Sequence, residues 1–265
     1  PAYPVIAGVP LPVAIPFGFI PQFPERSTGI LIPTLGEEQA RGFFMRDGGF
    51  YLVFGEYFDL SVTGDIYTLG SWAINVNSRY KVNYKFSGSF SVNYSNDQTG
   101  EKGSPDFFKS SNFGVKWSHS QDPKAHPGQS FSASVNFSSP SNSQYNSQSI
   151  TEALQNQISS SISFSRNWNG KINLSVNALH SQNSRDSSYA FTLPNITFSV
   201  SRFYPFKKKV RVGKEKFYEK FSFGYSTTIQ NKINFKAKEF NQPGFWEKFN
   251  NGMTHNFQIG LPSFD

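Results

Sequence analysis

The chain has 265 residues, a formal charge of +7, no cysteine, and a 17% share of aromatic residues that is high for its 37% apolar content. The lack of cysteine excludes disulfides, thiolate metal sites and cysteine nucleophiles. No run of about 18 apolar residues occurs, which excludes a membrane-spanning helix. The positive charge lies mainly in turns and in one local run, so it does not indicate a nucleic-acid-binding face.

Residues 1–36 are rich in proline and glycine. Proline lacks the N–H that donates to a neighbouring strand, so strands that contain it are expected at a sheet edge or interrupted. Two short apolar runs survive between the prolines, at residues 13–20 and 29–32. The sequence therefore predicts a leading segment, 1–36, that differs from the remainder, 37–265.

From residue 42 onward, apolar and polar residues alternate with a period of two, which is typical of β-strands. Around residue 60, Leu60 and Val62 share one face, while Asp59 and Asp65 share the other. The pattern returns in about a dozen segments, each near the ~9–11 residues that a tilted membrane-spanning strand requires. We therefore predict an all-β fold, an antiparallel transmembrane β-barrel, with Asp59 and Asp65 on its polar, lumen-facing side.

Polar stretches connect the predicted strands, at residues 95–104, 122–129, 138–151 and 181–188. A soluble β-sandwich would alternate in the same way, and it remains the alternative fold. The barrel is favoured because the polar positions are mainly Ser, Asn and Thr, with fewer of the Lys and Glu that coat soluble sheets. Aromatic residues also gather near strand ends, as they do at membrane interfaces.

Motifs that carry covalent chemistry are missing from the sequence. The four histidines are His119, His126, His180 and His255, and none stands at metal-ligand spacing from another histidine or an acid. No Gly-rich loop leads into a helix, and no serine lies in a nucleophile elbow. The sequence therefore predicts no enzymatic activity, no metal and no cofactor.

One connector carries a run of basic residues between two aromatic segments. The run consists of Lys207, Lys208, Lys209, Arg211, Lys214 and Lys216. Water and salt screen such a cluster, so a solvated turn at the membrane surface is one interpretation. The other is a contact with anionic lipid headgroups or phosphates.

Several motifs in the first third of the chain occur in a characteristic order. They are LPVAIPFG at 11–18, RSTGILIP at 26–33, RGFF at 41–44, GGFY at 48–51, YFDLSVTGDIY at 57–67 and GSW at 70–72. This order resembles the start of the barrel in the LptD family of outer-membrane LPS-assembly proteins, also called the OstA family. Two later segments, 117–125 and 201–208, resemble a divergent branch of the same family, and the resemblance covers most of residues 10–225.

The resemblance implies an integral protein of the Gram-negative outer membrane that assembles lipopolysaccharide (LPS) there. Family barrels follow a periplasmic β-jellyroll and are plugged by a lipoprotein of the LptE type. Periplasmic bridge proteins deliver LPS, which leaves sideways through a seam between the first and last strands. About a dozen strands would not close so large a barrel. The chain also begins at Pro1 without a signal peptide. We therefore expect the N-terminal half of the barrel, without the jellyroll and the C-terminal half.

The prolines gain a role from the resemblance, because the family's first strands contain prolines that weaken the seam. Pro16 lies in the first matching apolar run and Pro33 directly follows the second, and the two are the predicted lateral-gate residues. Alternatively, both prolines simply end short strands. The alternative function is that of a porin-like outer-membrane channel or transporter for small solutes. With either function, outer-membrane lipids would surround the protein.

Overall fold

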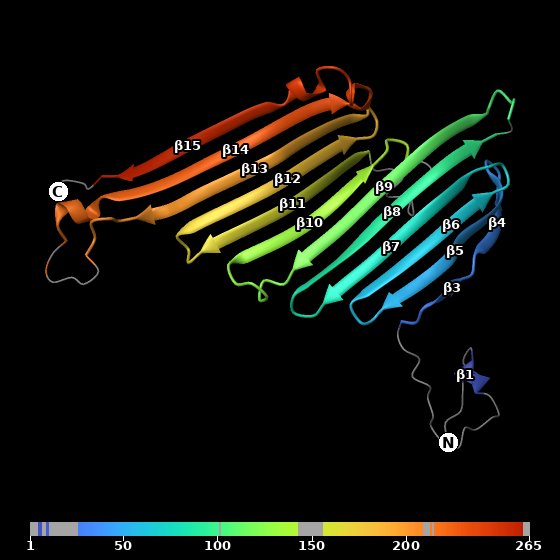
Figure 1. The fold of residues 1–265 in the computed structure, drawn as a ribbon, viewed down its shortest axis with the longest axis horizontal. Helices are drawn as coiled ribbons and strands as arrows, with labels where there is room; N and C mark the ends of the chain where they lie inside the picture. The colour runs from blue at the N-terminus through green and yellow to red at the C-terminus, as the bar shows by residue number, and fades with distance from the viewer. Residues whose placement is uncertain are drawn as a thin grey trace.

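The computed structural model describes residues 5–6, 9–10, 26–100, 102–142, 156–208, 213 and 215–261. Strands β1 (Val5–Ile6) and β2 (Val9–Pro10) form a small antiparallel pair of their own. All other strands belong to one antiparallel sheet of 13 strands, in which almost every strand pairs with its neighbour in sequence (Figure 1). The predicted all-β antiparallel fold is confirmed.

The strands of the large sheet are β3 (Gly29–Leu31), β4 (Thr34–Glu38), β5 (Gly42–Phe54), β6 (Phe58–Tyr67), β7 (Trp72–Val82), β8 (Phe86–Thr99), β9 (Phe108–Gln121), β10 (Gln129–Ser138), β11 (Gln157–Trp168), β12 (Ile172–Asn183), β13 (Ser188–Phe203), β14 (Ser222–Lys236) and β15 (Asn250–Gly260). Short 3-10 helices lie at η1 (Phe217–Lys220), η2 (Ala237–Glu239) and η3 (Phe245–Lys248). Among the described residues, no helix has the length and apolar character needed to cross a membrane.

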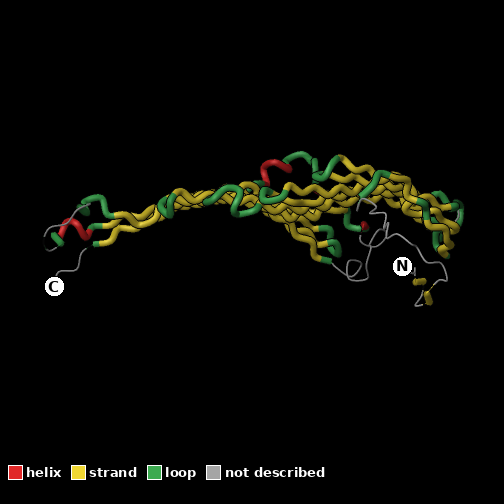
Figure 2. Tube along the Cα trace, turned by 90° about the horizontal axis from the view of Figure 1, so that it is seen from below, coloured by secondary structure: helices red, strands yellow, loops and turns green. Residues whose placement is uncertain are grey.

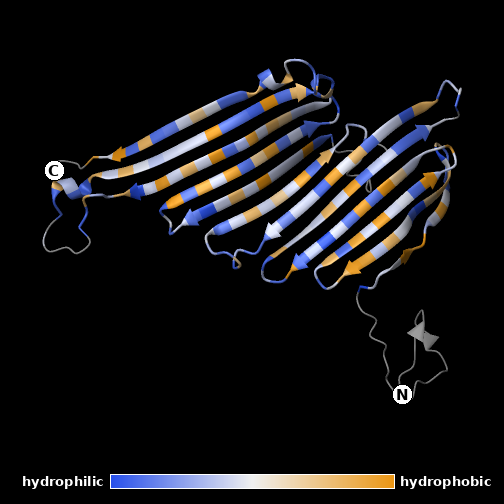
Figure 3. Ribbon diagram, in the orientation of Figure 1, coloured by the Kyte–Doolittle hydropathy of each residue, from blue (hydrophilic) through white to orange (hydrophobic). Residues whose placement is uncertain are grey.

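The sheet has one apolar face and one polar face, because side chains alternate across a pleated strand. Ile74 on β7 faces Tyr94 on β8, which in turn faces Phe113 on β9. The adjacent positions carry Asn75 and Asn93, which point to the opposite face. Figure 3 shows this alternation as bands of hydrophobic and hydrophilic residues along each strand. Seen from below, the sheet is a single curved layer (Figure 2).

The strand ends define two rims. The near rim holds the turns at 55–57, 83–85, 122–128 and 169–171, together with residues 204–208 and 215–221. The far rim holds the turns at 39–41, 68–71, 102–107, 184–187 and 237–249. The backbone N–H of Val53 donates to Thr28 Oγ1 at 3.0 Å, so the chain joins the sheet at the near rim. Between the first and last strands, β3 and β15, the strand order is linear, and no ladder joins the two edges in the part described.

Several strands are longer than the sequence pattern predicted, reaching 16 residues in β13. The predicted connector at 95–104 was partly wrong, because β8 continues to Thr99. Its polar residues look like a loop in sequence, yet they pair across strands: Ser95 faces Asn112, and Asn96 Nδ2 donates to Ser111 Oγ at 3.1 Å. The connector predicted at 181–188 was likewise too long, since β12 runs to Asn183.

Among the described residues, three β-bulges shift the side-chain phase within a strand, one in β5 and two in β13, the last of them between Val200 and Phe203. In β5 the register against β6 slips between Met45 and Gly48. As a result, Met45 before the bulge and Phe50 after it reach the same apolar face. In a regular strand, two residues five positions apart would point to opposite faces. A second slip, in β13 between Thr192 and Asn195, does the same for Phe191 and Ile196.

Candidate functional site

The first edge of the sheet is a strand broken in its middle. Strands β3 and β4 both pair with β5, and Leu31 opposite Gly49 keeps the same register as Thr34 opposite Arg46. The ladder is interrupted between them, at Ile32 and Pro33, as expected for a residue without an N–H. Ile32 is 87% exposed. The edge therefore presents two short ladders where an ordinary strand would present one.

The opposite strand is shaped to fit this interruption. A Cβ added to Gly48 would lie 3.0 Å from the Pro33 Cβ, so the ring packs directly over a glycine. Asp47 has a left-handed backbone, with φ of 60°, and its N–H donates to Asp65 Oδ1 at 2.8 Å. Asp65 thus binds a backbone group in the bulge that lies opposite the broken strand.

Asp59 lies on the same polar face of β6 as Asp65, but nearer the near rim. It is only 2% exposed and accepts hydrogen bonds from the Arg79 backbone N–H at 3.2 Å and from the Tyr51 hydroxyl at 3.1 Å. The guanidinium groups of Arg26 and Arg79 each lie 3.3 Å from Asp59 Oδ2. Through Arg26, this carboxylate ties the segment that leads into β3 to the sheet.

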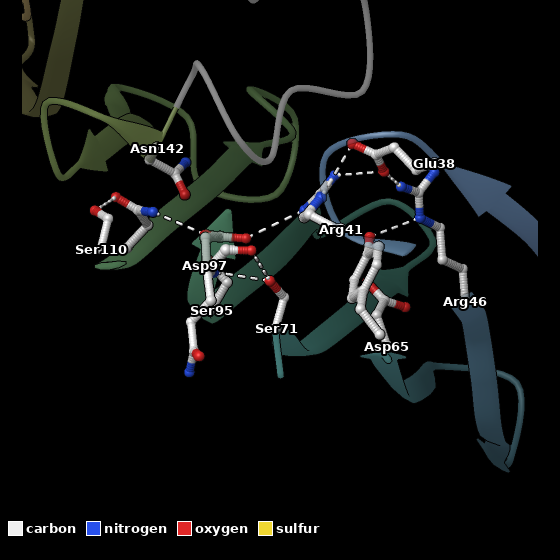
Figure 4. Close-up of polar contacts among 12 residues, drawn as sticks. Glu38, Arg41, Arg46, Asp65, Ser71, Ser95, Asp97, Ser110 and Asn142 are labelled. Carbon is white, nitrogen blue, oxygen red and sulfur yellow. Dashed lines mark hydrogen bonds and ion pairs between the residues drawn. The ribbon is translucent and has the colours of Figure 1, made fainter. Parts of the chain in front are cut away.

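A denser ionic cluster lies at the far rim, on the polar face of the same edge (Figure 4). Arg41, in the turn between β4 and β5, lies between Glu38 and Asp97, at 3.0 Å and 3.2 Å. Its guanidinium also stacks 4.4 Å from the centre of the Tyr67 ring. Arg46 binds both Glu38 and the Tyr67 hydroxyl. The cluster connects the edge hairpin to strands β6 and β8.

Asp97 is the most buried acid of this cluster, at 3% exposed. Its second oxygen accepts from Ser95 Oγ at 2.5 Å and from Asn112 Nδ2 at 2.8 Å. Burial lowers the pKa of Arg41, but the hydrogen bond and charge of Glu38, with the charges of Tyr67 and Asp97, outweigh it, and the pKa is raised. The cation is therefore firmly held at the far rim.

On the opposite, apolar face, the edge carries a groove of about 680 Å³. Leu35, Phe43, Met45 and Ile66 line it, from strands β4, β5 and β6. Leu35 and Phe43 are 72% and 62% exposed. An apolar groove next to a sheet edge can accommodate hydrocarbon chains, whereas the face behind it carries the ion pairs of Glu38, Arg41 and Asp97.

The remaining predicted site residues are more dispersed. Pro16, Lys209 and Arg211 lie outside the described residues. Lys207 and Lys208 are exposed in the connector at the near rim, where Lys207 Nζ lies 3.9 Å from Glu215 Oε1 and 5.4 Å from the Tyr204 ring centre. The structure thus brings Pro33 close to Asp65 through β5, but it leaves the basic run on a separate connector.

Sequence reasoning missed the cluster around Arg41. Its contact with Asp97 spans 56 positions, and no local pattern reports such a pair. A weak signal was available in Glu38 and Arg41, which stand three apart across a short turn. Among the residues that the structure describes, no group of His, Cys, Asp or Glu has the arrangement of a metal site.

The sequence model of a protein family, described as LptD protein, matches residues 1–265. Among curated proteins, no sequence matches the chain.

Proposed function

Because the chain belongs to the LptD protein family, we propose that its broken edge forms one side of a seam through which LPS passes sideways into the outer leaflet. The family functions in LPS transport and assembly in the outer membrane, and it is a family of transport proteins and not of enzymes. The seam would be the route that LPS takes into the outer leaflet. The observation that carries it is the interruption of the edge strand at Pro33.

The two faces of the sheet fit two parts of the cargo. In this proposal, the apolar face meets membrane lipid and the polar face lines the lumen, as in other outer-membrane barrels. Asp59 and Asp65 then face the lumen. Sugars would pass along the polar face, which offers Ser and Asn side chains such as Asn75, Asn77 and Asn93. Acyl chains would pass along the apolar groove that Leu35 and Phe43 line.

The orientation of the sheet in the outer membrane follows from the rim at which the chain joins it. Residues 26–28 lie at the near rim, and in the family the barrel follows a periplasmic jellyroll. The near rim would therefore face the periplasm, and the far rim would face the cell exterior. Aromatic side chains support an interface at the near rim, where Trp117 Nε1 donates to Tyr80 Oη at 2.9 Å and Tyr80 Oη lies 2.8 Å from His119 Nδ1. The basic connector with Lys207 and Lys208 would then lie at anionic headgroups of the inner leaflet.

Proline makes such a seam easier to open. Each proline removes one donor, and a net loss of about 1 kcal/mol per hydrogen bond is modest. The bulge opposite the gap is itself held by a side chain, since the Asp47 N–H donates to Asp65 Oδ1. A short seam with several missing bonds could therefore separate without unfolding the sheet. A lipoprotein plug of the LptE type and periplasmic LPS bridge proteins are the proposed partners.

The test replaces the prolines in the intact protein in growing cells. Pro16→Ala with Pro33→Ala restores two donors, so we expect a tighter seam and slower arrival of pulse-labelled LPS at the cell surface. Pro105→Ala, in the turn between β8 and β9, is the matched control, because this proline lies outside any strand. Unchanged LPS arrival and unchanged vancomycin sensitivity in the double variant would refute the gate.

A further inference from the structure

A second interruption lies inside the sheet, between β10 and β11. The ladder between these strands covers only Gln129 to Ser134 on β10. Beyond it, the Ser160 hydroxyl bridges the gap, donating to the Asn136 carbonyl at 2.7 Å and accepting from the Asn136 N–H at 2.9 Å. Further along, Gln182 Nε2 reaches across from β12 and donates to the Ser138 carbonyl at 2.7 Å. Side chains thus replace part of a backbone ladder.

A cavity of about 330 Å³ opens on the apolar face at this interruption. Its lining includes Val135, Phe137, Ile162, Ala178, His180 and Phe191, from four strands. The size falls at the lower end of ordinary ligand sites, which span ~300–1,000 Å³. The bulge in β13 borders the cavity through Leu193. The site is separate from the edge groove, which lies on β4 to β6.

His180 is the one polar ring in this lining, and its hydrogen bonds determine its tautomer. Ser160 Oγ lies 3.1 Å from His180 Nδ1. The single hydroxyl proton of Ser160 is already donated to Asn136, so Nδ1 must carry the proton of this contact. The neutral ring then leaves Nε2 as an acceptor. His180 is 7% exposed, and its Nε2 has no hydrogen-bond partner among the described residues.

A buried acceptor without a partner in an apolar site is unfavourable, and a ligand donor would satisfy it. We propose that this cavity binds one acyl chain of LPS, with a hydroxyl or amide N–H near the polar end of that chain donating to His180 Nε2. The apolar lining would hold the hydrocarbon. A phospholipid chain held through an ester offers no such donor, which is why the cavity is assigned to LPS.

The location of the cavity agrees with that cargo. His180 stands three positions before Asn183, where β12 ends at the far rim. At about 3.4 Å per residue, this is roughly 10 Å below the end of the strand. The assignment rests on the proposed function, in which the far rim faces outward and the apolar face meets lipid. LPS that has left the seam would then contact the barrel wall at this cavity.

The experiment places the photoreactive residue p-benzoylphenylalanine into the intact protein in growing cells. Phe137 lines the cavity, whereas Phe131 lies on the same face of the same strand outside it. We expect strong LPS capture from Phe137 and little from Phe131. His180→Leu should lower capture from Phe137 about five-fold, as expected for one lost hydrogen bond. His255→Leu, which changes a histidine on β15 bonded to Tyr225, should leave capture unchanged.

A second pair of variants tests the cavity without touching the histidine. Ala178→Phe should fill the cavity and abolish capture, whereas Val176→Phe, two residues away on the same face, should not. Equal capture from Phe137 and Phe131, or capture of phospholipid alone, would overturn the assignment. A probe at Phe43 in the edge groove separates the two proposals. LPS captured at Phe43 but not at Phe137 overturns only the cavity, and LPS captured at neither overturns both.

Discussion

The backbone ladder of the sheet is interrupted at the edge and again between β10 and β11, and different kinds of side chain stabilise the two places. At the edge, the gap at Pro33 lies beside a polar face on which Glu38, Arg41 and Asp97 form ion pairs. Between β10 and β11, the bridging groups are the neutral side chains of Ser160 and Gln182. The difference follows from the faces involved, because the edge cluster uses the polar face and the interior bridges use the apolar one.

Charge on an apolar, lipid-covered face is costly, whereas on a lumenal face water and neighbouring polar groups support it. An edge strand with missing backbone bonds can therefore be held by ion pairs on its polar side. An interruption on the apolar side has to rely on short neutral side chains that satisfy backbone groups directly. The comparison predicts that the two regions respond differently to loss of charge, to loss of a hydroxyl, and to salt.

The largest expected effect is at the edge. Arg41→Met keeps an unbranched apolar stem but removes the guanidinium, which leaves Asp97 buried without this ion-pair partner. Removing one member of a buried pair typically costs ~3–5 kcal/mol, and the 11% exposure of Arg41 places the expected loss near the lower value. The measurement is urea unfolding of the intact protein in detergent, followed by its heat-modifiable gel mobility.

Arg79→Met is the matched control, because the Arg79 side chain is 65% exposed and the buried Asp59 keeps its ion pair with Arg26. Exposed ion pairs contribute ~1 kcal/mol or less. A loss at Arg41 no greater than that at Arg79 would mean that the far-rim cluster does not fasten the edge.

A smaller effect is expected at the interior interruption. Ser160→Ala removes the group that serves both the N–H and the carbonyl of Asn136. Leaving buried backbone groups unsatisfied costs roughly 1–3 kcal/mol. Ser165→Ala on the same strand is the control, since the Ser165 hydroxyl contacts the hydroxyl of Ser130, which is exposed to solvent, and bridges no backbone groups among the described residues. Equal unfolding midpoints for the two variants would argue that the bridge adds nothing.

The alternation of residue types was enough to predict much of the fold. Because the pleat has a period of two, the placement of Asp59 and Asp65 on one face of β6 follows directly from the sequence. The interruption at Pro33 also follows from the chemistry of proline, which lacks a ladder donor. Both features are local, so a single stretch of sequence contains the information.

The rest depends on contacts that no local pattern encodes. The bulge between Met45 and Gly48 inverts the phase of β5, and an unbroken alternation would place Phe50 on the wrong face. The polar end of β8 looks like a loop until Ser95 and Asp97 meet Asn112 on the next strand. The cavity at His180 arises where a ladder stops, which only the pairing of β10 with β11 reveals.

The smallest expected effect separates the two interruptions by their response to salt. Raising the ionic strength from about 0.1 M to 1 M shortens the screening length from ~10 Å to ~3 Å, which weakens exposed pairs more than buried ones. Glu38 and Arg46 are each 33% exposed, so the edge ladder should open more often in high salt. The neutral Ser160 bridge carries no net charge, so its opening should not change.

Amide hydrogen exchange of the intact protein in detergent measures both regions at once. Amides of β4 and of Phe44 on β5 report the edge, and the Asn136 amide reports the bridge. We expect salt to speed exchange at the edge by a few-fold, which corresponds to less than about 1 kcal/mol. Glu38→Gln should remove this salt response, because the neutral amide pairs with neither Arg41 nor Arg46 as an ion. A salt response of equal size at Asn136 would show that the two interruptions do not differ in their electrostatics.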